Sequence, residues 1–376
     1  FQEQLMQIAI DVGNFTPSEA DKLRQAIGSK RSRERMEQLK ERFFAGMRDN
    51  GIDDELGEQI WLKLAAFANY GFPESHSVSF SYLVYASSWI KYHYPAAFCA
   101  ALLNAQPMGF WSPHTLVGDA RRHGVAVHTP DLNASAASAS LEGDGEAEVR
   151  LGLGYVRGIG ADLAEEISAG RPYTSVEDLR RRVPELSLPI LEALATAGAF
   201  GCFGIDRRSA LWTAGAMAQT SADRLPGIIT GIDAPTLPGM SPEETAHADL
   251  WATGIAPDGH PTIFIRDELT KIGVVMATGL VDHPDGERVF VGGVVTHRQR
   301  PATAGGTTFL NLEDETGLIN VVISKGCWQR YKKAARGAPA LLIRGRLEKE
   351  EGVINVVADK IEPLPVIKTL PSRDFR

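Results

Sequence analysis

The chain has 376 residues, of which 44% are hydrophobic and 23% charged, and a net charge of -8. This length accommodates two to four domains of about 100 to 200 residues, and the acidic balance excludes a uniformly basic nucleic-acid binder. No apolar run reaches the ~18 residues of a membrane span. Because Cys99, Cys202 and Cys327 lack metal-ligand spacing, we expect reduced core thiols in a cytoplasmic protein.

A helical pattern with a basic segment fills the first hundred residues. The stretch Thr16–Glu19 predicts a capped helix start with proline at the first helical position. Residues 32–50 predict a second helix, and between Lys22 and Arg48 nine basic residues accompany three acidic ones. Its basic face, with Arg31, Arg35 and Arg42, is either a contact for a phosphate backbone or a solvated face laced with glutamates.

A long helix is predicted from Val78 until Pro95 ends it. Its apolar side chains recur at helical spacing, so we expect one face to pack hard against a neighbour. They are Val78, Tyr82, Tyr85, Trp89 and Tyr92. Ser75 is expected to cap this helix, which puts His76 and Ser77 in the first turn, where free backbone N–H groups attract phosphate. The alternative is a capped helix start in which the histidine forms its hydrogen bonds with a neighbouring residue and binds no ligand.

Several separated blocks resemble, in the same order, the fingers region of bacterial C-family DNA polymerases, the polymerase III alpha subunit and its relatives. The blocks are Gln4–Gln7, Gly28–Arg31, Phe67–Ser77, Lys91–Phe98 and Leu102–Asn104. Replicative members usually carry a lysine before the Ser-His pair, whereas Glu74 here resembles the error-prone, ImuC-type branch and argues against one basic phosphate contact.

This resemblance implies that residues of the fingers lie nearest the incoming nucleotide and the primer-template. They are Lys30, Arg31, His76 and Ser77, and the basic helix adds Arg35.

The middle of the chain predicts a connector followed by paired hairpins. Residues 116–122 look helical, 125–127 form a short strand, and 134–148 are expected to be a flexible surface loop without chemistry. Gly158-Ile159-Gly160 precedes a helix over 161–169, so its backbone can approach a phosphate closely. The pattern resembles a helix-hairpin-helix, with a partner unit over 188–199, and a purely structural helical hairpin is the alternative. The expected contacts to a duplex backbone are Arg157, Gly158, Gly160 and Gly198.

Residues 205–270 predict a second connector with two or three helices. In replicative relatives a sliding-clamp peptide lies in this neighbourhood, but Gln219–Gly227 lacks its Leu-Phe ending. We therefore expect this chain to reach the clamp only indirectly, through a partner.

From Lys271 to Pro363 the hydrophobic period changes to that of strands, in the order β-β-β-α-β-β of an OB-fold. Residues 313–317 are the predicted hairpin turn, whose acidic side chains are expected to be caps or solvated charge. Phe290 and Trp328 are expected in the core. Phe309 is expected to stack on bases, with arginines on the exposed strand faces contacting the backbone of a single strand. These arginines are Arg298, Arg300, Arg344 and Arg346. With 13 basic and 11 acidic residues in this region, an OB-fold that binds protein is the alternative.

The fold class expected is multidomain, with mainly α-helical fingers and a tandem helix-hairpin-helix region followed by a β-barrel OB-fold. The expected limits are 1–104 for the fingers, 105–149 for a connector, 150–204 for the tandem helix-hairpin-helix, 205–270 for a connector, 271–364 for the OB-fold and 365–376 for a tail.

The resemblance implies the C-terminal portion of an error-prone DNA polymerase that acts in translesion synthesis and damage-induced mutagenesis. We expect no catalytic residue and no metal ligand here, because no Asp-x-Asp cluster is present and the family's palm aspartates, with their Mg²⁺, lie upstream. The implied partners are primer-template DNA, a deoxynucleoside triphosphate, and ImuB-type and ImuA-type proteins. The alternative is a protein-recruitment module with little affinity for DNA.

Overall fold

The computed structural model describes residues 1–27, 32–67, 73–217, 234–301, 304–364 and 373–375. The chain divides into two compact units, Phe1–Ile90 and Lys91–Arg376. Within the described ranges, no helix combines the length and the apolar character needed to cross a membrane.

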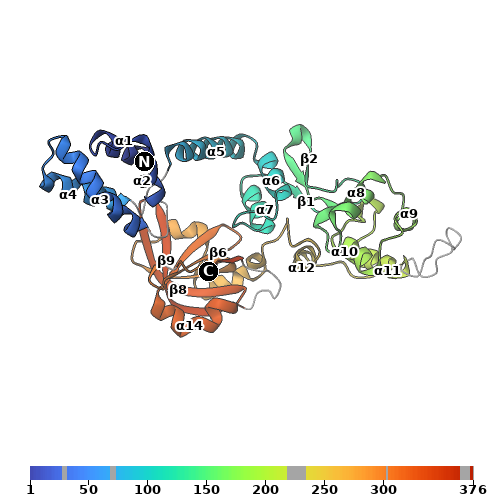
Figure 1. Ribbon diagram of the computed structural model, residues 1–376. Helices are drawn as coiled ribbons and strands as arrows, with labels where there is room; N and C mark the ends of the chain where they lie inside the picture. The colour runs from blue at the N-terminus through green and yellow to red at the C-terminus, as the bar shows by residue number, and fades with distance from the viewer. Residues whose placement is uncertain (28–31, 68–72, 218–233, 302–303, 365–372, 376) are drawn as a thin grey trace. The chain divides into compact units, whose positions relative to one another are not determined.

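The first unit is helical, as predicted (Figure 1). Its first four helices are α1 (Gln2–Asp11), α2 (Pro17–Ile27), α3 (Ser32–Asp49) and α4 (Asp54–Phe67). The predicted cap of α2 is present, because the side chains of Thr16 and Glu19 each accept a hydrogen bond from the other residue's backbone N–H. The core of this unit centres on Phe43 and Trp61, whose ring centroids lie 5.6 Å apart.

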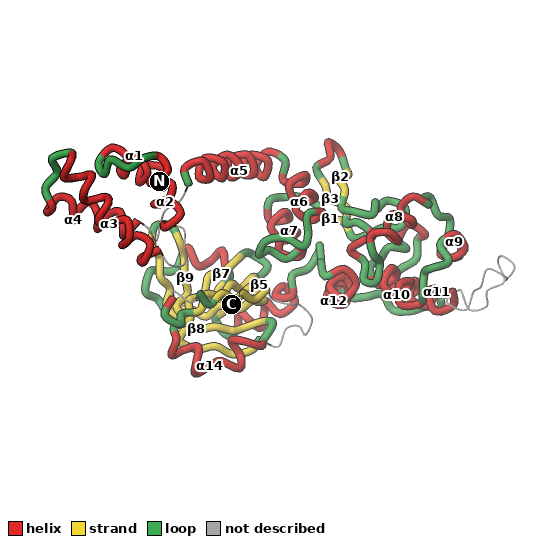
Figure 2. The backbone as a smooth tube through the Cα atoms, viewed as in Figure 1, coloured by secondary structure: helices red, strands yellow, loops and turns green. Residues whose placement is uncertain are grey.

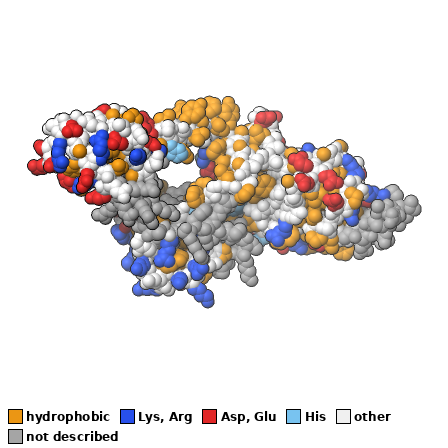
Figure 3. Space-filling model, in the orientation of Figure 1, with side chains coloured by type: hydrophobic (Ala, Val, Ile, Leu, Met, Phe, Trp, Pro, Cys, Tyr) orange, Lys and Arg blue, Asp and Glu red, His pale blue; other side chains and the backbone are white. Residues whose placement is uncertain are grey.

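Helix α5 (Glu74–His93) differs from the prediction, because none of its residues is buried. Spacing by three and four residues shows that apolar side chains share a face, but it does not show that a neighbour covers that face. Figure 3 shows hydrophobic side chains gathered along this helix. The exposed ones are Val78, Phe80, Tyr82, Leu83, Val84, Tyr85, Trp89, Ile90 and Tyr92.

The second unit begins with α6 (Pro95–Asn104), α7 (Pro113–Arg122) and a small sheet of order β1-β3-β2. Its strands are β1 (Val127–His128), β2 (Ser140–Glu142) and β3 (Glu148–Arg150). The expectation of a flexible surface loop over 134–148 is therefore wrong. Ser135 is fully buried and donates a hydrogen bond to the carbonyl of Leu151 (2.8 Å), because small side chains let this segment pack closely.

The next part of the chain has a core made largely of leucine and alanine side chains. The helices that form this part are drawn in red in Figure 2. They are α8 (Ala161–Ala169), α9 (Val176–Arg182), α10 (Leu188–Thr196), α11 (Arg207–Met217) and α12 (Pro242–Thr253). The connecting 3-10 turns are η1 (Asp144–Glu146), η2 (Leu153–Tyr155), η3 (Gly201–Phe203), η4 (Pro261–Ile265) and η5 (Ala277–Val281). The short helix α13 (Arg266–Lys271) directly follows η4. Cys99 is buried, but Cys202 is exposed, so the expectation of a core thiol is wrong for Cys202.

A closed barrel with the predicted strand order completes this unit. The strands are β4 (Val274–Val275), β5 (Arg288–Gln299), β6 (Thr308–Glu313), β7 (Leu318–Ile323), β8 (Ala340–Glu350), β9 (Val353–Pro363) and β10 (Arg373–Phe375), with α14 (Lys325–Gly337) between β7 and β8. Strand β5 pairs with both β6 and β8, and β7 pairs in parallel with β9, which closes the barrel. The expected OB-fold is thus confirmed, and Trp328 lies in its core. The expected domain limits stay predictions.

Candidate nucleic-acid interface

Four neighbouring barrel strands carry two rows of side chains in register on their outer face. Alternate residues of these strands, such as Leu310 and Val321, fill the core, so the residues between them face outward. The first row is Gln299, Phe309, Val322 and Val357, and the second is His297, Asn311, Asn320 and Asn355. We call these two rows the open face. The two rows are offset by two residues along each strand, so the distance between them is about 7 Å.

The open face combines one aromatic ring with a line of amides. Phe309 is 40% exposed, which leaves its ring available for stacking. In the second row, Asn311 donates a hydrogen bond to Asn320 (2.8 Å), and Asn320 donates to the carbonyl of Ile354 (3.4 Å). Amide groups both donate and accept hydrogen bonds, so this row matches the edges of nucleobases without adding charge.

Two aromatic residues from the connector, Phe110 and Trp111, lie at the end of the asparagine row. Their rings contact the ring of His297, at centroid distances of 6.5 and 5.3 Å, and burial lowers the pKa of His297. Phe110 is nevertheless 47% exposed and Trp111 37%. Sequence reasoning missed this pair, although two adjacent aromatic residues in a connector rich in glycine and proline were a usable signal.

A cavity of about 390 Å³ lies beyond Trp111. Its walls are mainly apolar, with Phe98, Leu102, Leu116 and Leu318 among them. Leu318 and Asn320 are two residues apart on β7, so both side chains point away from the barrel core. The cavity therefore continues the open face. Burial raises the pKa of the Cys99 thiol in this wall to about 12, so the thiol stays protonated.

Helix α14 supplies the positive charge near the open face. It begins directly after β7 and carries five exposed basic residues and no acidic one. They are Lys325, Arg330, Lys332, Lys333 and Arg336, and none of them has an ion-pair partner among the described residues. Lys and Arg side chains accordingly gather over this part of the molecule in Figure 3. Sequence reasoning counted these charges but did not single them out.

The four arginines expected to contact a single strand differ in their surroundings. Arg298 is buried and donates to the carbonyls of Ala335 and Ala338 at the end of α14, so its expected exposure is wrong. Arg344 is paired with Asp359 (2.7 Å), and Arg346 is paired with Glu348. Arg300 is exposed and lies 5.6 Å from the ring of Trp328, beside the open face.

The predicted helix-hairpin-helix turn has the expected backbone conformation, but its arginine, Arg157, is bound to another part of the chain. Gly158 has a φ of +82°, which side-chain-bearing residues rarely adopt, and Gly160 precedes α8 with open space around its missing side chain. Gly198 has the same φ at the second turn. Arg157 donates to the carbonyl of Trp251 (3.1 Å) and stacks over its ring, so its guanidinium already has partners.

The residues expected near the nucleotide are only partly described. Lys30 and Arg31 lie outside the described residues, and Arg35 is in α3, but its side chain is outside them. His76 is exposed against Phe80, and the hydroxyl of Ser77 donates to the carbonyl of Pro73. Their contacts with nucleotide stay predictions.

The start of α5 differs from its predicted cap. The helix already begins at Glu74, so Ser75 lies inside it, and the expected serine cap is wrong. Instead, the carboxylate of Glu3 accepts a hydrogen bond from the backbone N–H of Glu74 (2.9 Å), and this bond lowers the pKa of Glu3. A carboxylate of the chain itself thus occupies part of the position where a phosphate was expected.

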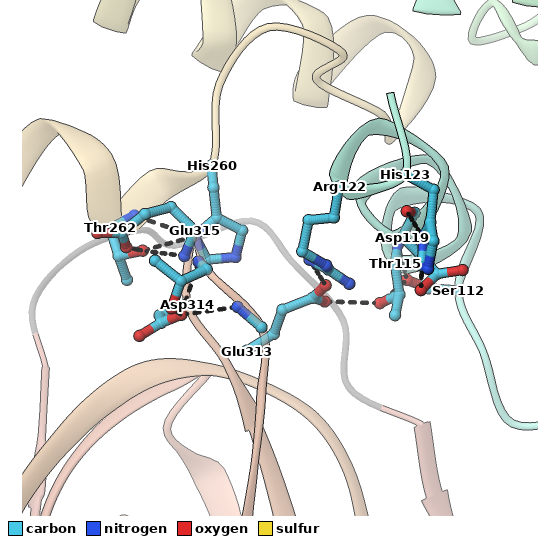
Figure 4. A network of polar contacts seen from close by, with 12 residues as sticks. Ser112, Thr115, Asp119, Arg122, His123, His260, Thr262, Glu313, Asp314 and Glu315 are labelled. Carbon is cyan, nitrogen blue, oxygen red and sulfur yellow. Dashed lines mark hydrogen bonds and ion pairs between the residues drawn. The ribbon is translucent and has the colours of Figure 1, made fainter. Parts of the chain in front are cut away.

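The acidic turn of the barrel belongs to a buried network, shown in Figure 4. Glu313 accepts hydrogen bonds from Thr115 (2.9 Å) and Arg122 (3.2 Å), and Asp314 is fully buried. Burial raises the pKa of Glu313. Arg266 pairs with Glu315 in the same network. Of the two alternatives for these acids, solvated charge is therefore wrong, whereas Asp314 does cap the turn by accepting from the backbone N–H groups of Thr316 and Gly317. Glu313 and Glu315 bind α7 and α13 to the barrel turn.

Three family models match parts of the chain. The model described as bacterial DNA polymerase III alpha subunit finger domain matches residues 1–51, a helix-hairpin-helix motif matches 124–210, and an OB-fold nucleic acid binding domain matches 289–364. Among solved structures, asparaginyl-tRNA synthetase from Pyrococcus horikoshii is similar over 26% of this chain and 24% of its own, with a TM-score of 0.23 and 22% identity.

Curated relatives match the chain from end to end. The error-prone DNA polymerases of Mycolicibacterium paratuberculosis and Mycobacterium tuberculosis H37Rv are each 58% identical over 381 residues, covering 100% of this chain and 35% and 34% of their own lengths. That of Corynebacterium glutamicum is 51% identical over 379 residues, covering 100% of this chain and 36% of its own. The chain thus spans about a third of the length of these relatives.

Proposed function

We propose, from the homology of this chain along its whole length to error-prone DNA polymerases, that it is the part of such an enzyme that holds DNA outside the catalytic centre. The relatives bear out the resemblance first seen in the sequence. The observation that carries the proposal is the open face, where an exposed ring and an amide row lie beside a helix with five cations that form no ion pair with any described residue. Stacking platforms next to positive charge are the chemistry of single-strand binding.

In this proposal the parts of the chain divide the DNA between them. The barrel holds single-stranded template, the helix-hairpin-helix turns at Gly158 and Gly198 meet the duplex backbone, and the helical unit lies nearest the primer-template and the incoming deoxynucleoside triphosphate. The whole enzyme would act in translesion synthesis in the cytoplasm, with ImuB-type and ImuA-type partners and an indirect link to the sliding clamp.

Polymerisation would depend on Mg²⁺ held by residues elsewhere. Two Mg²⁺ ions require closely placed carboxylates. Within the described ranges, the one group of three candidate ligands is His128, Glu142 and Glu148, in the small sheet. A histidine-containing group does not fit a pair of Mg²⁺ ions, which take oxygen ligands, so no step of polymerisation is assigned to this chain.

Phe309→Ala tests the proposal. Loss of one stacking platform removes about 1–3 kcal/mol, so the affinity for a single-stranded oligonucleotide should fall by between about fivefold and about 150-fold, while Phe309→Tyr keeps most of it. Fluorescence anisotropy with a labelled oligonucleotide measures both. Trp212→Ala is the matched control, because Trp212 is 48% exposed but belongs to α11. Unchanged binding by Phe309→Ala would refute the assignment of the open face.

A second function, docking of another polypeptide, is favoured by the exposed apolar side chains of α5. Such a face is larger than the scattered apolar residues of an ordinary surface. The two functions differ in their response to salt, because DNA binding releases counterions and weakens steeply as salt rises, whereas an apolar docking interface does not. Binding of the oligonucleotide without a salt dependence would favour docking as the main role of the chain.

A further inference from the structure

Three side chains from separate strands meet on the outer face of the small sheet β1-β3-β2. His128 lies opposite Arg150 on β3, and Glu142 lies opposite Glu148. Val149, between Glu148 and Arg150, is fully buried, so the residues on either side of it point outward. The pairing of the strands therefore brings His128, Glu142 and Glu148 together.

The distances within this cluster are close to those of a metal site. Nε2 of His128 lies 2.6 Å from a carboxylate oxygen of Glu148, a hydrogen bond that a bound ion would replace, and 3.4 Å from one of Glu142. One ligand atom from each residue lies within 4.8 Å of the others. Tetrahedral zinc with bonds of about 2.0–2.2 Å separates its ligand atoms by about 3.3–3.6 Å, so small side-chain movements are sufficient.

Neighbouring groups hold both carboxylates in place. Arg150 donates two hydrogen bonds to Glu142 (2.9 and 2.7 Å) and a third to the carbonyl of Thr129 (2.8 Å). The stem of Glu148 lies against Gly143, where a side-chain carbon would approach it to 2.9 Å. Each carboxylate oxygen has two lone pairs, so Glu142 can accept from Arg150 and still bind an ion. Such outer contacts orient the ligands of metal sites in general.

We propose that His128, Glu142 and Glu148 bind one zinc ion, with water at the fourth position. An imidazole nitrogen with two carboxylates suits zinc, whereas Mg²⁺ prefers six oxygen ligands. The two carboxylates outweigh the single charge of Arg150, so the cluster attracts a cation. The ion would tie β1, β2 and β3 together at the entry to the helix-hairpin-helix core. This inference does not depend on the proposed DNA-binding function.

Zinc titration of the whole chain against a chromophoric chelator near neutral pH tests this site. We expect the wild-type chain to retain one zinc ion that His128→Gln and Glu148→Gln each lose. His123→Gln is the matched control, because His123 is another exposed histidine beside a carboxylate, Asp119, and it should retain the ion. Circular dichroism without zinc should be the same for all four proteins, and zinc should raise the melting temperature of the wild type and the control alone.

Cobalt substitution separates this site from binding at the cysteines. The proposed ligands give a spectrum without thiolate-to-metal charge transfer, whereas a thiolate band would overturn the assignment. Uptake of the same amount of zinc by His128→Gln and wild type, or no uptake by the wild type in excess zinc, would also overturn it.

Discussion

His114 and His260 are buried against each other, with ring centroids 5.8 Å apart. Burial, with the nearby charge of Arg122, lowers the pKa of His114 to about 4. Burial also lowers the pKa of His260, and His114, Arg122 and Arg266 add to this effect. Both rings are therefore neutral in the folded chain at pH values where they would be charged in the unfolded chain.

Mild acid should destabilise the fold through these histidines. Because the folded-state pKa of His114 is below its unfolded value near 6.5, the unfolded chain binds more protons as the pH falls, and folding loses about 2 kcal/mol at pH 5 from His114 alone. Glu313 opposes this in part: its raised pKa favours the folded state at low pH, and that contribution is lost as the pH rises through the folded-state pKa. Urea unfolding between pH 7.5 and 5 measures the slope.

His114→Asn identifies the residue responsible. The asparagine amide can take the place of Nδ1 as acceptor for the backbone N–H of Ala256, but it does not titrate. The variant should therefore show a flatter dependence of the free energy of unfolding on pH. An unchanged slope would contradict the assignment of this acid sensitivity to His114.

At the scale of elements, α14 gathers positive charge on one side. Lys332 and Arg336 follow the kink at Tyr331 and are four residues apart, which places them on the same helical face. Trp328 and Ala335, each three residues after a lysine of this helix, lie beside these cations and are buried in the barrel. A helix anchored in this way holds its cations at a fixed position relative to β7 and the open face.

Lys332→Glu should weaken binding of a single-stranded oligonucleotide and reduce its salt dependence. A lysine that neutralises one phosphate contributes about 0.7 to the slope of log K against log salt, so the slope should fall by about that amount. Lys63→Glu, an exposed lysine of α4, makes the same charge change outside the barrel and should leave the slope unaltered. Equal effects of the two variants would mean that overall charge, and not α14, determines binding.

Elements with their own local signals could be predicted from the sequence. The helix over 161–169 and the strand over 318–323 have the predicted bounds, because a periodic apolar pattern and flanking glycine or serine fix both ends. The segment 134–148 could not be predicted, because its small residues form no such pattern, although Ser135 is fully buried.

The site was less accessible to sequence reasoning than the fold. Phe309 follows from the alternation of β6, but Thr115 and Glu313, which form one hydrogen bond, are separated by 198 residues. The burial of the acidic turn depends on that contact across the chain, which no local spacing encodes. For the same reason, the sequence places Arg298 in a strand but does not reveal that its side chain binds the end of α14.

At the scale of the whole molecule, two kinds of DNA contact should be separable by mutation. Gly160 has a φ of -82°, and no described atom other than its chain neighbours lies within 4 Å of the place where a side chain would begin. A side chain can therefore start there without a clash at its Cβ, and the φ angle is one that residues with side chains adopt. A leucine side chain at this position would obstruct the approach of a phosphate to the backbone N–H groups at the start of α8.

Gly160→Leu should accordingly weaken binding of blunt duplex DNA several-fold and leave the affinity for a single strand unaltered. Phe309→Ala should do the reverse, because stacking requires unpaired bases. On a primer-template with an overhang, the two losses of binding free energy should add, since the sites share no side chain. Anisotropy titrations of the two variants and their combination on the three DNAs measure this. If Phe309→Ala lost as much duplex binding as Gly160→Leu, the hairpin turns and the open face would not be separate contacts. At independent sites, a substitution in the site for single-stranded DNA leaves duplex binding unaltered.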